Sequence, residues 1–142
     1  MEEKIHWNDT LADQTIMKFN EAGNEIEMEK WIAYNTAKPT SYATNHTSFK
    51  YDDKGNKIEQ KEYFDNKVIS KSTWQFDKKN KVISGSFSNA IMGTIITKCK
   101  YDGSGNKTEV RGFMYSLLDS NMIMEDSVKY SYDGEGNAKE VE

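Results

Sequence analysis

Two residues that often constrain a small protein are nearly missing from this sequence. Cysteine occurs once, at Cys99, so the chain has neither an internal disulfide nor a cysteine metal site. Proline also occurs once, at Pro39, which leaves long β-strands uninterrupted. The two histidines, His6 and His46, have no further His or Cys at the spacing of zinc ligands. We therefore expect neither a metal nor a cofactor.

Long apolar runs and an excess of basic residues are missing too. No stretch of about 18 apolar residues occurs, so we expect no membrane-spanning segment. The net charge is -4, whereas a nucleic-acid partner calls for a basic surface, so we expect no nucleic acid. Aromatic residues make up 12% of the chain, too many for a disordered protein. The composition predicts one folded domain over residues 1–142.

The main feature that the sequence does contain is a recurrent short motif, which we call the phrase. An aromatic residue is followed by Asp or Asn, two variable residues, and Gly or Asn. The Asp side chain can cap a type I turn by accepting a hydrogen bond from the backbone N–H two residues on. The Gly suits the left-handed position that follows, which makes a hairpin with a bulge, and Asn80 is the next-best residue there. The five copies begin at Phe19, Tyr51, Phe76, Tyr101 and Tyr132.

Residues flanking the phrase alternate between apolar and polar, as half-buried strands do. Segments 65–67 and 88–90 are too short to hold crossover helices between strands. The sequence therefore predicts an all-β fold: an antiparallel up-and-down meander of about ten strands built from hairpin repeats. It is either a curled open sheet or a closed barrel. Residues 1–12 are a lead-in with two readings, a short helix capped by Asn8-Asp9-Thr10 or an edge strand over residues 5–7.

The phrase resembles the YD repeat of RHS-type proteins. The most similar copy is Tyr51-Asp52 with Gly55-Asn56, followed by Ile58-Glu59. This resemblance implies β-strips at bacterial surfaces, in exported proteins that bind or encapsulate, and it implies no catalytic residues. We accordingly expect a periplasmic or cell-surface location with a trimmed export signal, and a cytoplasmic location is the alternative.

No set of residues in the sequence converges on catalysis. The carboxylates that alternate with apolar residues predict a solvated outward face, and these are Glu25, Glu27, Glu29, Glu59 and Glu109. No nucleophile elbow and no phosphate-binding glycine loop is present. We therefore expect that the protein is not an enzyme. Glu62 is the exception among the carboxylates, because its alternation places it on the inner face, where it either meets a ligand or lies at an exposed edge.

Two groups of residues are the candidate binding sites. The first is a set of exposed aromatics that would stack on a sugar or a protein partner: Trp31, Tyr34 and Tyr63. The second is a hollow of small residues on the face of Trp74, formed by Ser70, Ser72, Ser84 and Ser86. The plainer reading is that small residues merely let the sheet bend.

These features predict a non-enzymatic binding or structural module with a carbohydrate or protein partner. The alternative is a small, lipocalin-like barrel that carries an apolar or amphipathic ligand.

Overall fold

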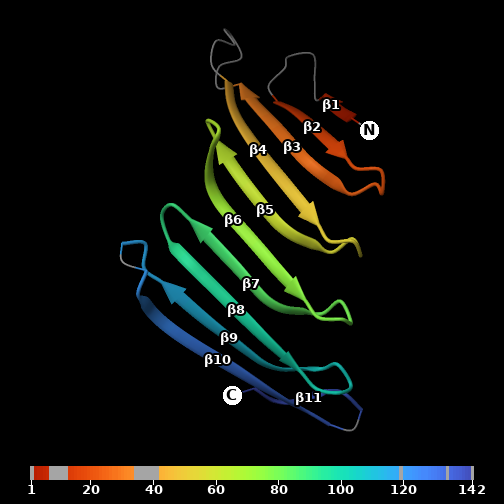
Figure 1. Cartoon of the computed structure of the whole chain (residues 1–142), viewed down its shortest axis with the longest axis vertical. Helices are drawn as coiled ribbons and strands as arrows, with labels where there is room; N and C mark the ends of the chain where they lie inside the picture. Colours follow the sequence, from red (N-terminus) through yellow and green to blue (C-terminus); the bar gives the residue numbers. More distant parts are fainter. Residues whose placement is uncertain (1, 7–12, 34–41, 119, 134, 142) are drawn as a thin grey trace. The chain divides into compact units, whose positions relative to one another are not determined.

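The computed structural model describes residues 2–6, 13–33, 42–118, 120–133 and 135–141, and within them the chain forms eleven β-strands and no helix (Figure 1). No helix long and apolar enough to cross a membrane is found in these ranges. The strands are β1 (Glu2–His6), β2 (Asp13–Phe19), β3 (Glu25–Ala33), β4 (Tyr42–Tyr51), β5 (Lys57–Phe64), β6 (Lys67–Phe76), β7 (Val82–Asn89), β8 (Gly93–Tyr101), β9 (Lys107–Tyr115), β10 (Met122–Tyr132) and β11 (Ala138–Val141).

The order of strands in the sheet is the order of the sequence, so the predicted antiparallel meander is confirmed. This order runs from β1 to β11 without returning to β1, so of the two expected forms the open sheet is found. The lead-in contributes strand β1, paired with β2, and the alternative helix at residues 8–10 lies outside the described residues.

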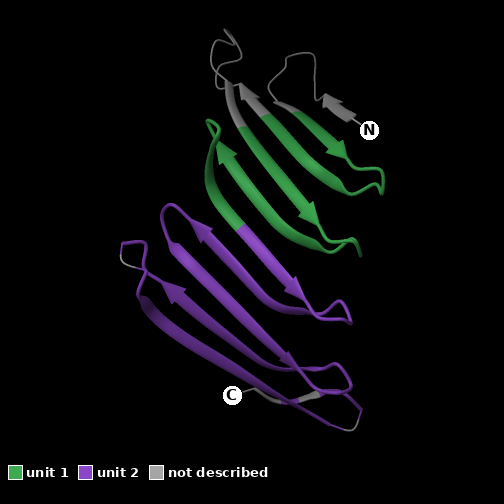
Figure 2. Cartoon of the chain, viewed as in Figure 1, with its two compact units in different colours: residues 1–71 green, residues 72–142 purple. Residues whose placement is uncertain are grey.

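The residues group into two compact units, 1–71 and 72–142, with the division inside β6 (Figure 2). The expectation of a single repeat domain stays a prediction.

Each copy of the phrase forms the same hairpin turn. In the second copy the N–H of Asp52 donates to the carbonyl of Asn56 at 2.9 Å, and the N–H of Gly55 donates to the carbonyl of Asp52 at 3.0 Å. The equivalent pair of hydrogen bonds occurs in the other four copies. The Asp52 side chain also accepts from the N–H of Lys54 at 3.0 Å, as predicted. Asn80 has φ 61°, so it does replace glycine at the left-handed position.

Four of these turns are followed by one extra residue in the returning strand. Lys50 pairs with Glu59, but the next residue, Tyr51, pairs with Lys57, so Ile58 is left over as a β-bulge. The same shift separates the corresponding pairs in the first, fourth and fifth copies. A one-residue bulge reverses which side chains of the returning strand share a face with the outgoing strand.

A second regularity joins the fourth and the fifth copy of the phrase to the copy before each of them. The hydroxyl of Tyr101 donates to the carbonyl of Val82 at 2.9 Å, and the hydroxyl of Tyr132 donates to the carbonyl of Lys107 at 2.7 Å. Val82 and Lys107 occupy the same place in their copies, six residues after the aromatic. We call this contact the tyrosine clasp. It gives the phrase aromatic a structural role beyond packing.

No hydrophobic side chain of the described residues is fully buried. A sheet that is covered on neither face cannot draw its stability from a closed core. It depends on hydrogen-bonded turns, on cross-strand side-chain pairs and on contacts between repeats. Substitutions in the turns and clasps should therefore have clear effects on stability.

The first prediction concerns the left-handed turn position. Gly55 has φ +82° and open space around its Cα, so Gly55→Ala imposes only a backbone cost. We expect a loss of about 1–2 kcal/mol in the free energy of unfolding, measured by urea denaturation. Gly103→Ala is the control, because Gly103 also has open space but not a positive φ. Equal effects of the two substitutions would contradict the role of the left-handed position.

The second prediction concerns the tyrosine clasp. Tyr101→Phe removes one hydroxyl and leaves the carbonyl of Val82 without that donor. We expect the free energy of unfolding to fall by about 0.5–1.5 kcal/mol. Tyr130→Phe is the matched control, since Tyr130 lies on a strand but outside the phrase aromatics. A clasp variant as stable as the wild type would show that the hydroxyl does not link the repeats.

Candidate functional site

An apolar groove lies on one face of residues 72–142. Its volume is about 290 Å³, near the lower end for small-molecule sites. Strands β6, β7 and β8 supply its walls and floor, so neighbouring strands of one sheet form it. The lining residues are Ser72, Trp74, Val82, Gly85, Ser86, Phe87, Ile95, Thr97 and Cys99.

The floor of the groove is a lane of small residues that crosses the strands. Gly85 pairs with Thr97, and Thr97 pairs with Gly112 on β9, so these three lie in one row. A Cβ on Gly112 would meet no atom within 4 Å. The lane therefore continues beyond the groove lining as open space above the sheet.

Larger apolar side chains flank this lane on both sides. Phe87, Ile95 and Met114 pair in a row on one side of it. Cys99 and Val110 form a row on the other side. Because residues two apart on a strand point to the same face, both rows and the lane lie on one face of the sheet. A transverse channel with apolar walls results, and it suits an extended ligand.

The indole of Trp74 closes one end of the groove. A Cβ placed on Gly85 would lie 3.5 Å from Cδ1 and 3.9 Å from Nε1 of this indole, so the ring lies beside the glycine. Glycine at this position leaves part of the ring edge and face without a covering side chain. Trp74 is only half-buried. The groove thus combines an aromatic surface with the hydroxyl-bearing residues Ser72 and Thr97 among its lining.

Of the four serines predicted to form a hollow, Ser72 and Ser86 are among the lining residues of the groove, and Ser70 and Ser84 are not. Ser86 pairs with Ile96 and Ser84 with Lys98, whereas Gly85 pairs with Thr97. Ser84 and Ser86 therefore point to the face opposite Thr97.

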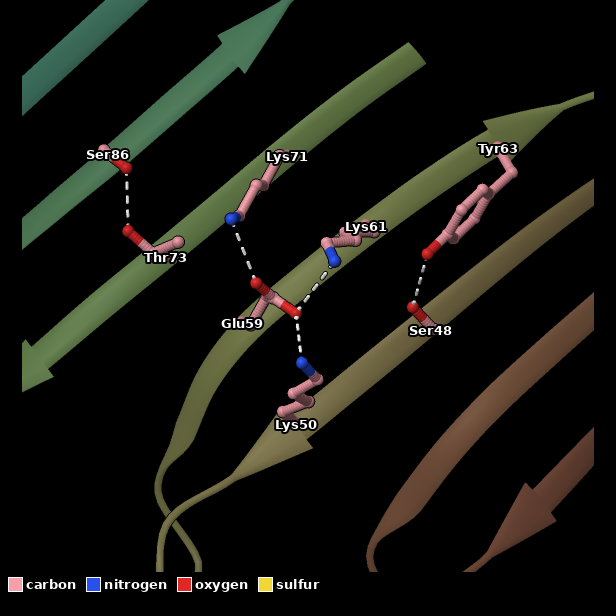
Figure 3. A network of polar contacts seen from close by, with 8 residues as sticks. All are labelled: Ser48, Lys50, Glu59, Lys61, Tyr63, Lys71, Thr73 and Ser86. Atoms are coloured by element: carbon pink, nitrogen blue, oxygen red, sulfur yellow. Dashed lines mark hydrogen bonds and ion pairs between the residues drawn. The ribbon is translucent and has the colours of Figure 1, made fainter. Parts of the chain in front are cut away.

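One contact agrees with this orientation. The Ser86 hydroxyl is hydrogen-bonded to that of Thr73 at 2.7 Å (Figure 3). Ser86 facing Thr73 and Gly85 facing Trp74 is the arrangement that a one-residue bulge after Val82, like the bulges of the other four copies, would produce. Gly85 lies on the groove face, where simple alternation along the strand predicts Ser84 and Ser86.

Glu62 and Ser70 lie together in residues 1–71. Ser70 Oγ donates to Glu62 Oε2 at 2.6 Å, and Ser70 is only 8% exposed. Glu62 pairs across the sheet with Thr47, while Gln60 pairs with Phe49, so Glu62 is on the predicted face. The hydroxyl of Ser70 provides the partner that an inward carboxylate requires. These two residues form a structural contact, and they belong to a different unit from the groove.

Of the three predicted stacking aromatics, Tyr63 is the one whose side chain lies within the described residues. Tyr63 is half-buried, its ring stacks on His46 with 4.9 Å between centroids, and its hydroxyl lies 3.4 Å from that of Ser48 (Figure 3). Its ring is therefore engaged within the sheet. Trp31 lies in β3, where its backbone pairs with Thr44, but its side chain is outside the described residues. Tyr34 lies outside them altogether.

The outward carboxylates are not simply solvated, as Glu59 shows most clearly. Three lysines surround it, with nitrogen–oxygen distances of 3.1 Å to Lys50, 3.3 Å to Lys61 and 3.1 Å to Lys71 (Figure 3). Its side chain is only 15% exposed. Burial raises the pKa of Glu59, but the hydrogen bonds from these lysines outweigh it and hold the pKa at about 2. Glu59 therefore stays ionised in all but strong acid.

A cross-strand pair of lysine and glutamate recurs beside the bulge. Lys18–Glu27 lies at 3.0 Å, Lys50–Glu59 at 3.1 Å and Lys100–Glu109 at 2.5 Å. In each case the lysine precedes the phrase aromatic. Lys100 also holds the pKa of Glu109 below its usual value. The repeat is thus longer than its turn, since it includes this ion pair.

Two polar depressions lie between consecutive phrase turns. One is lined by residues of the first and second copies, including Asp52 and Lys54, and the other by residues of the fourth and fifth copies, including Asp102 and Asp133. The side chain of each of these three aspartates accepts hydrogen bonds from backbone N–H groups of its own turn. In the described part of the chain, no group of three His, Cys, Asp or Glu could hold a metal ion. We therefore take the apolar groove as the candidate site.

Comparisons with known proteins give little further guidance. No protein-family model matches the chain, and no curated protein matches it. Among solved structures, it is similar to a Staphylococcus aureus TarM mutant in complex with fondaparinux, α-GlcNAc-glycerol and UDP. The identity is 17% over 85% of this chain, and this chain spans only 20% of that one. The TM-score is 0.27, and a likeness this weak carries no argument about function.

The third prediction concerns the charge on Glu59. Its folded pKa of about 2 lies below the ordinary value of 4.5, so its contribution to stability is present above pH 4.5 and is lost as the pH falls toward 2. Glu59→Gln should lower the free energy of unfolding by about 1 kcal/mol at pH 7, because the three lysines are partly exposed. At pH 2 the variant and the wild type should be equally stable.

Urea denaturation between pH 2 and pH 7 measures this difference. Glu21→Gln, on an exposed turn residue, is the control and should have little effect at any pH. A difference between Glu59→Gln and the wild type that does not change with pH would contradict the ionic origin of the effect.

Proposed function

We propose that the chain is a non-enzymatic binding module that holds a carbohydrate in the apolar groove of residues 72–142. The observation that supports this most is the position of the Trp74 indole beside a floor of glycine and threonine. The nonpolar C–H faces of a sugar pack well on an aromatic ring. Its hydroxyls would meet Ser72 and Thr97, which line the groove. The lane from Gly85 to Gly112 leaves space for more than one sugar unit.

The state of the carboxylates supports a binding role over a catalytic one. A general acid or base needs a pKa near the working pH, which for a carboxylate means a raised pKa. The shifted carboxylates here have lowered pKa values, and Glu59 and Glu109 are held by lysines. Neither of them lines the groove. Both carboxylates stay ionised at neutral pH and form ion pairs with lysines of the sheet.

The groove also favours surface binding over the carrier alternative. A carrier encloses its ligand and buries most of the ligand surface. This groove is lined from strands of a single sheet, and no apolar core closes over it in the described residues. A ligand would lie along the sheet with one side in water. The lipocalin-like function therefore stays a prediction without support.

We also propose that the protein is an exported bacterial one related to YD-repeat proteins. The support is the regular phrase turn, the recurrent Lys–Glu pair and the tyrosine clasp, which together define a repeat unit. Cell fractionation of the source organism would test the location. Recovery of the protein only in the cytoplasm would overturn the proposal of export.

The fourth prediction tests the groove by filling it. Gly112→Val places a side chain in the lane without a clash. Valine fits a strand better than glycine, so we expect the free energy of unfolding to stay equal or rise by about 0.5–1 kcal/mol. Binding to a glycan array should nevertheless fall at least tenfold.

A change on the opposite face is the control for this filling. Ser127→Val lies on β10 opposite Arg111, which is next to Gly112 and therefore points away from the groove. This variant should bind as the wild type does. Trp74→Ala should weaken binding as well. If Gly112→Val keeps full binding, the groove is not the site, and if the wild type binds no glycan, the carbohydrate proposal fails.

A further inference from the structure

One end of residues 72–142 exposes aliphatic side chains where turns normally carry polar ones. At the tip of the β7–β8 hairpin Ile91 is 86% exposed, and in the β9–β10 turn Leu118 is 97% exposed. Met92 and Leu117 beside them are about half exposed. We call this surface, residues 90–92, 117–118 and 122–124, the apolar end. Its members are the largest exposed apolar group in the part of the chain that the structure describes.

The two tips of the apolar end are neighbours. Thr94, Tyr115 and Met122 pair in a row across β8, β9 and β10, just inside the tips. The carbonyl of Tyr115 lies so near Gly93 that this residue has no room for a Cβ, and the backbone of Leu117 is also close. Figure 1 shows the two connections side by side. Their aliphatic side chains therefore form one continuous surface.

Turn chemistry does not require these aliphatic residues. The phrase turns at the other end of the same strands carry Asp, Lys, Ser, Asn, Glu and Gly and no aliphatic residue. Asn89 Oδ1 accepts hydrogen bonds from the N–H groups of Ile91 and Met92, so the polar side chain of Asn89 organises the tip without their help. Exposed Ile and Leu at such positions have a cost in water unless another apolar phase covers them.

Charge is also missing from this end. The segment 85–97 contains no charged residue, and 113–124 contains only Asp119, in a chain in which 30% of residues are charged. This depletion covers both strand ends as well as the tips. A surface that docks through ion pairs would instead be enriched in charged residues.

The apolar residues lie on both faces of the sheet at this end. Met122 pairs with Tyr115 and Met124 with Met114. Tyr115 and Met114 are consecutive, so they and their partners point to opposite faces. Both methionines are about half exposed. A protein that covers one face would leave the other face in water, whereas a lipid layer surrounds the tips and both faces equally.

We propose that the apolar end docks on the surface of a lipid bilayer, with the two hairpin tips inserted at the level of the headgroups. Insertion is shallow, because the backbone of the turns needs water or headgroup partners for its hydrogen bonds. Tyr115, just inside the tips, suits the boundary between apolar and polar phases. With no cationic residue at this end, binding does not need anionic lipid. The groove residues take no part, so this inference is independent of the proposed function.

Flotation of the full chain with vesicles of pure phosphatidylcholine tests this proposal. The wild type should float with the vesicles, and the double variant Ile91→Asn/Leu118→Asn should show at least a tenfold smaller bound fraction. Addition of phosphatidylserine should change wild-type binding less than twofold. Ile26→Asn/Ile83→Asn is the matched control, since both isoleucines are exposed but lie outside the apolar end, and it should float as the wild type does.

Three results would overturn the proposal. The wild type does not float, or the tip variant floats as well as the wild type, or binding appears only with anionic lipid. Light scattering after gel filtration tests the competing occupant, a second copy of the chain. If the wild type is a dimer and the tip variant a monomer of unchanged circular dichroism, the apolar end is a protein interface instead.

Discussion

The extra residue that follows the phrase turns is the constraint on which the rest of the structure depends. A residue at positive φ, such as Gly55 or Gly105, ends the turn, and the returning strand then contains a bulge. That bulge decides which side chains of the returning strand face which way. In residues 72–142 Gly85 lies beside Trp74 and the Ser86 hydroxyl bonds to Thr73, as the same shift after the third turn would require. The groove depends on this register.

A sheet without a closed core distributes its stability over many small contacts. Lys–Glu pairs such as Lys50–Glu59 tie the strands beside the bulge, and Glu59 holds two further lysines. Hydrogen bonds of the turns and of the tyrosine clasps add to these. No hydrophobic side chain of the described residues is fully buried, so these contacts take the place of a closed core in each unit. An ordinary two-layer protein of this size would have one face buried.

Much of the fold follows from the sequence, because turn chemistry is local. The phrase gives Asp52 and Gly55 their roles without knowledge of any distant residue, and alternation identifies the strands on either side. The faces were harder to predict. A bulge residue such as Ile58 looks like an ordinary strand residue in the sequence, so simple alternation predicts the wrong face for the residues of the strand beyond such a bulge.

The site depends on this register as well as on Gly85, for which alternation predicts no place on the groove face. The identical spacing of the Lys–Glu pairs around the aromatic was a signal that could have revealed the register. The tyrosine clasp could not be foreseen, since it joins residues of different repeats.

The tyrosine clasp has a direction, and that direction bears on how such a chain can change length. Each hydroxyl reaches back to the backbone of the preceding copy, and a backbone carbonyl is available whatever side chain stands there. A duplicated hairpin that begins with Tyr therefore contributes the hydroxyl that donates, and the preceding copy already contains the backbone carbonyl that accepts. Copies can be gained or lost by unequal exchange within the gene, and no existing contact has to evolve anew to receive them.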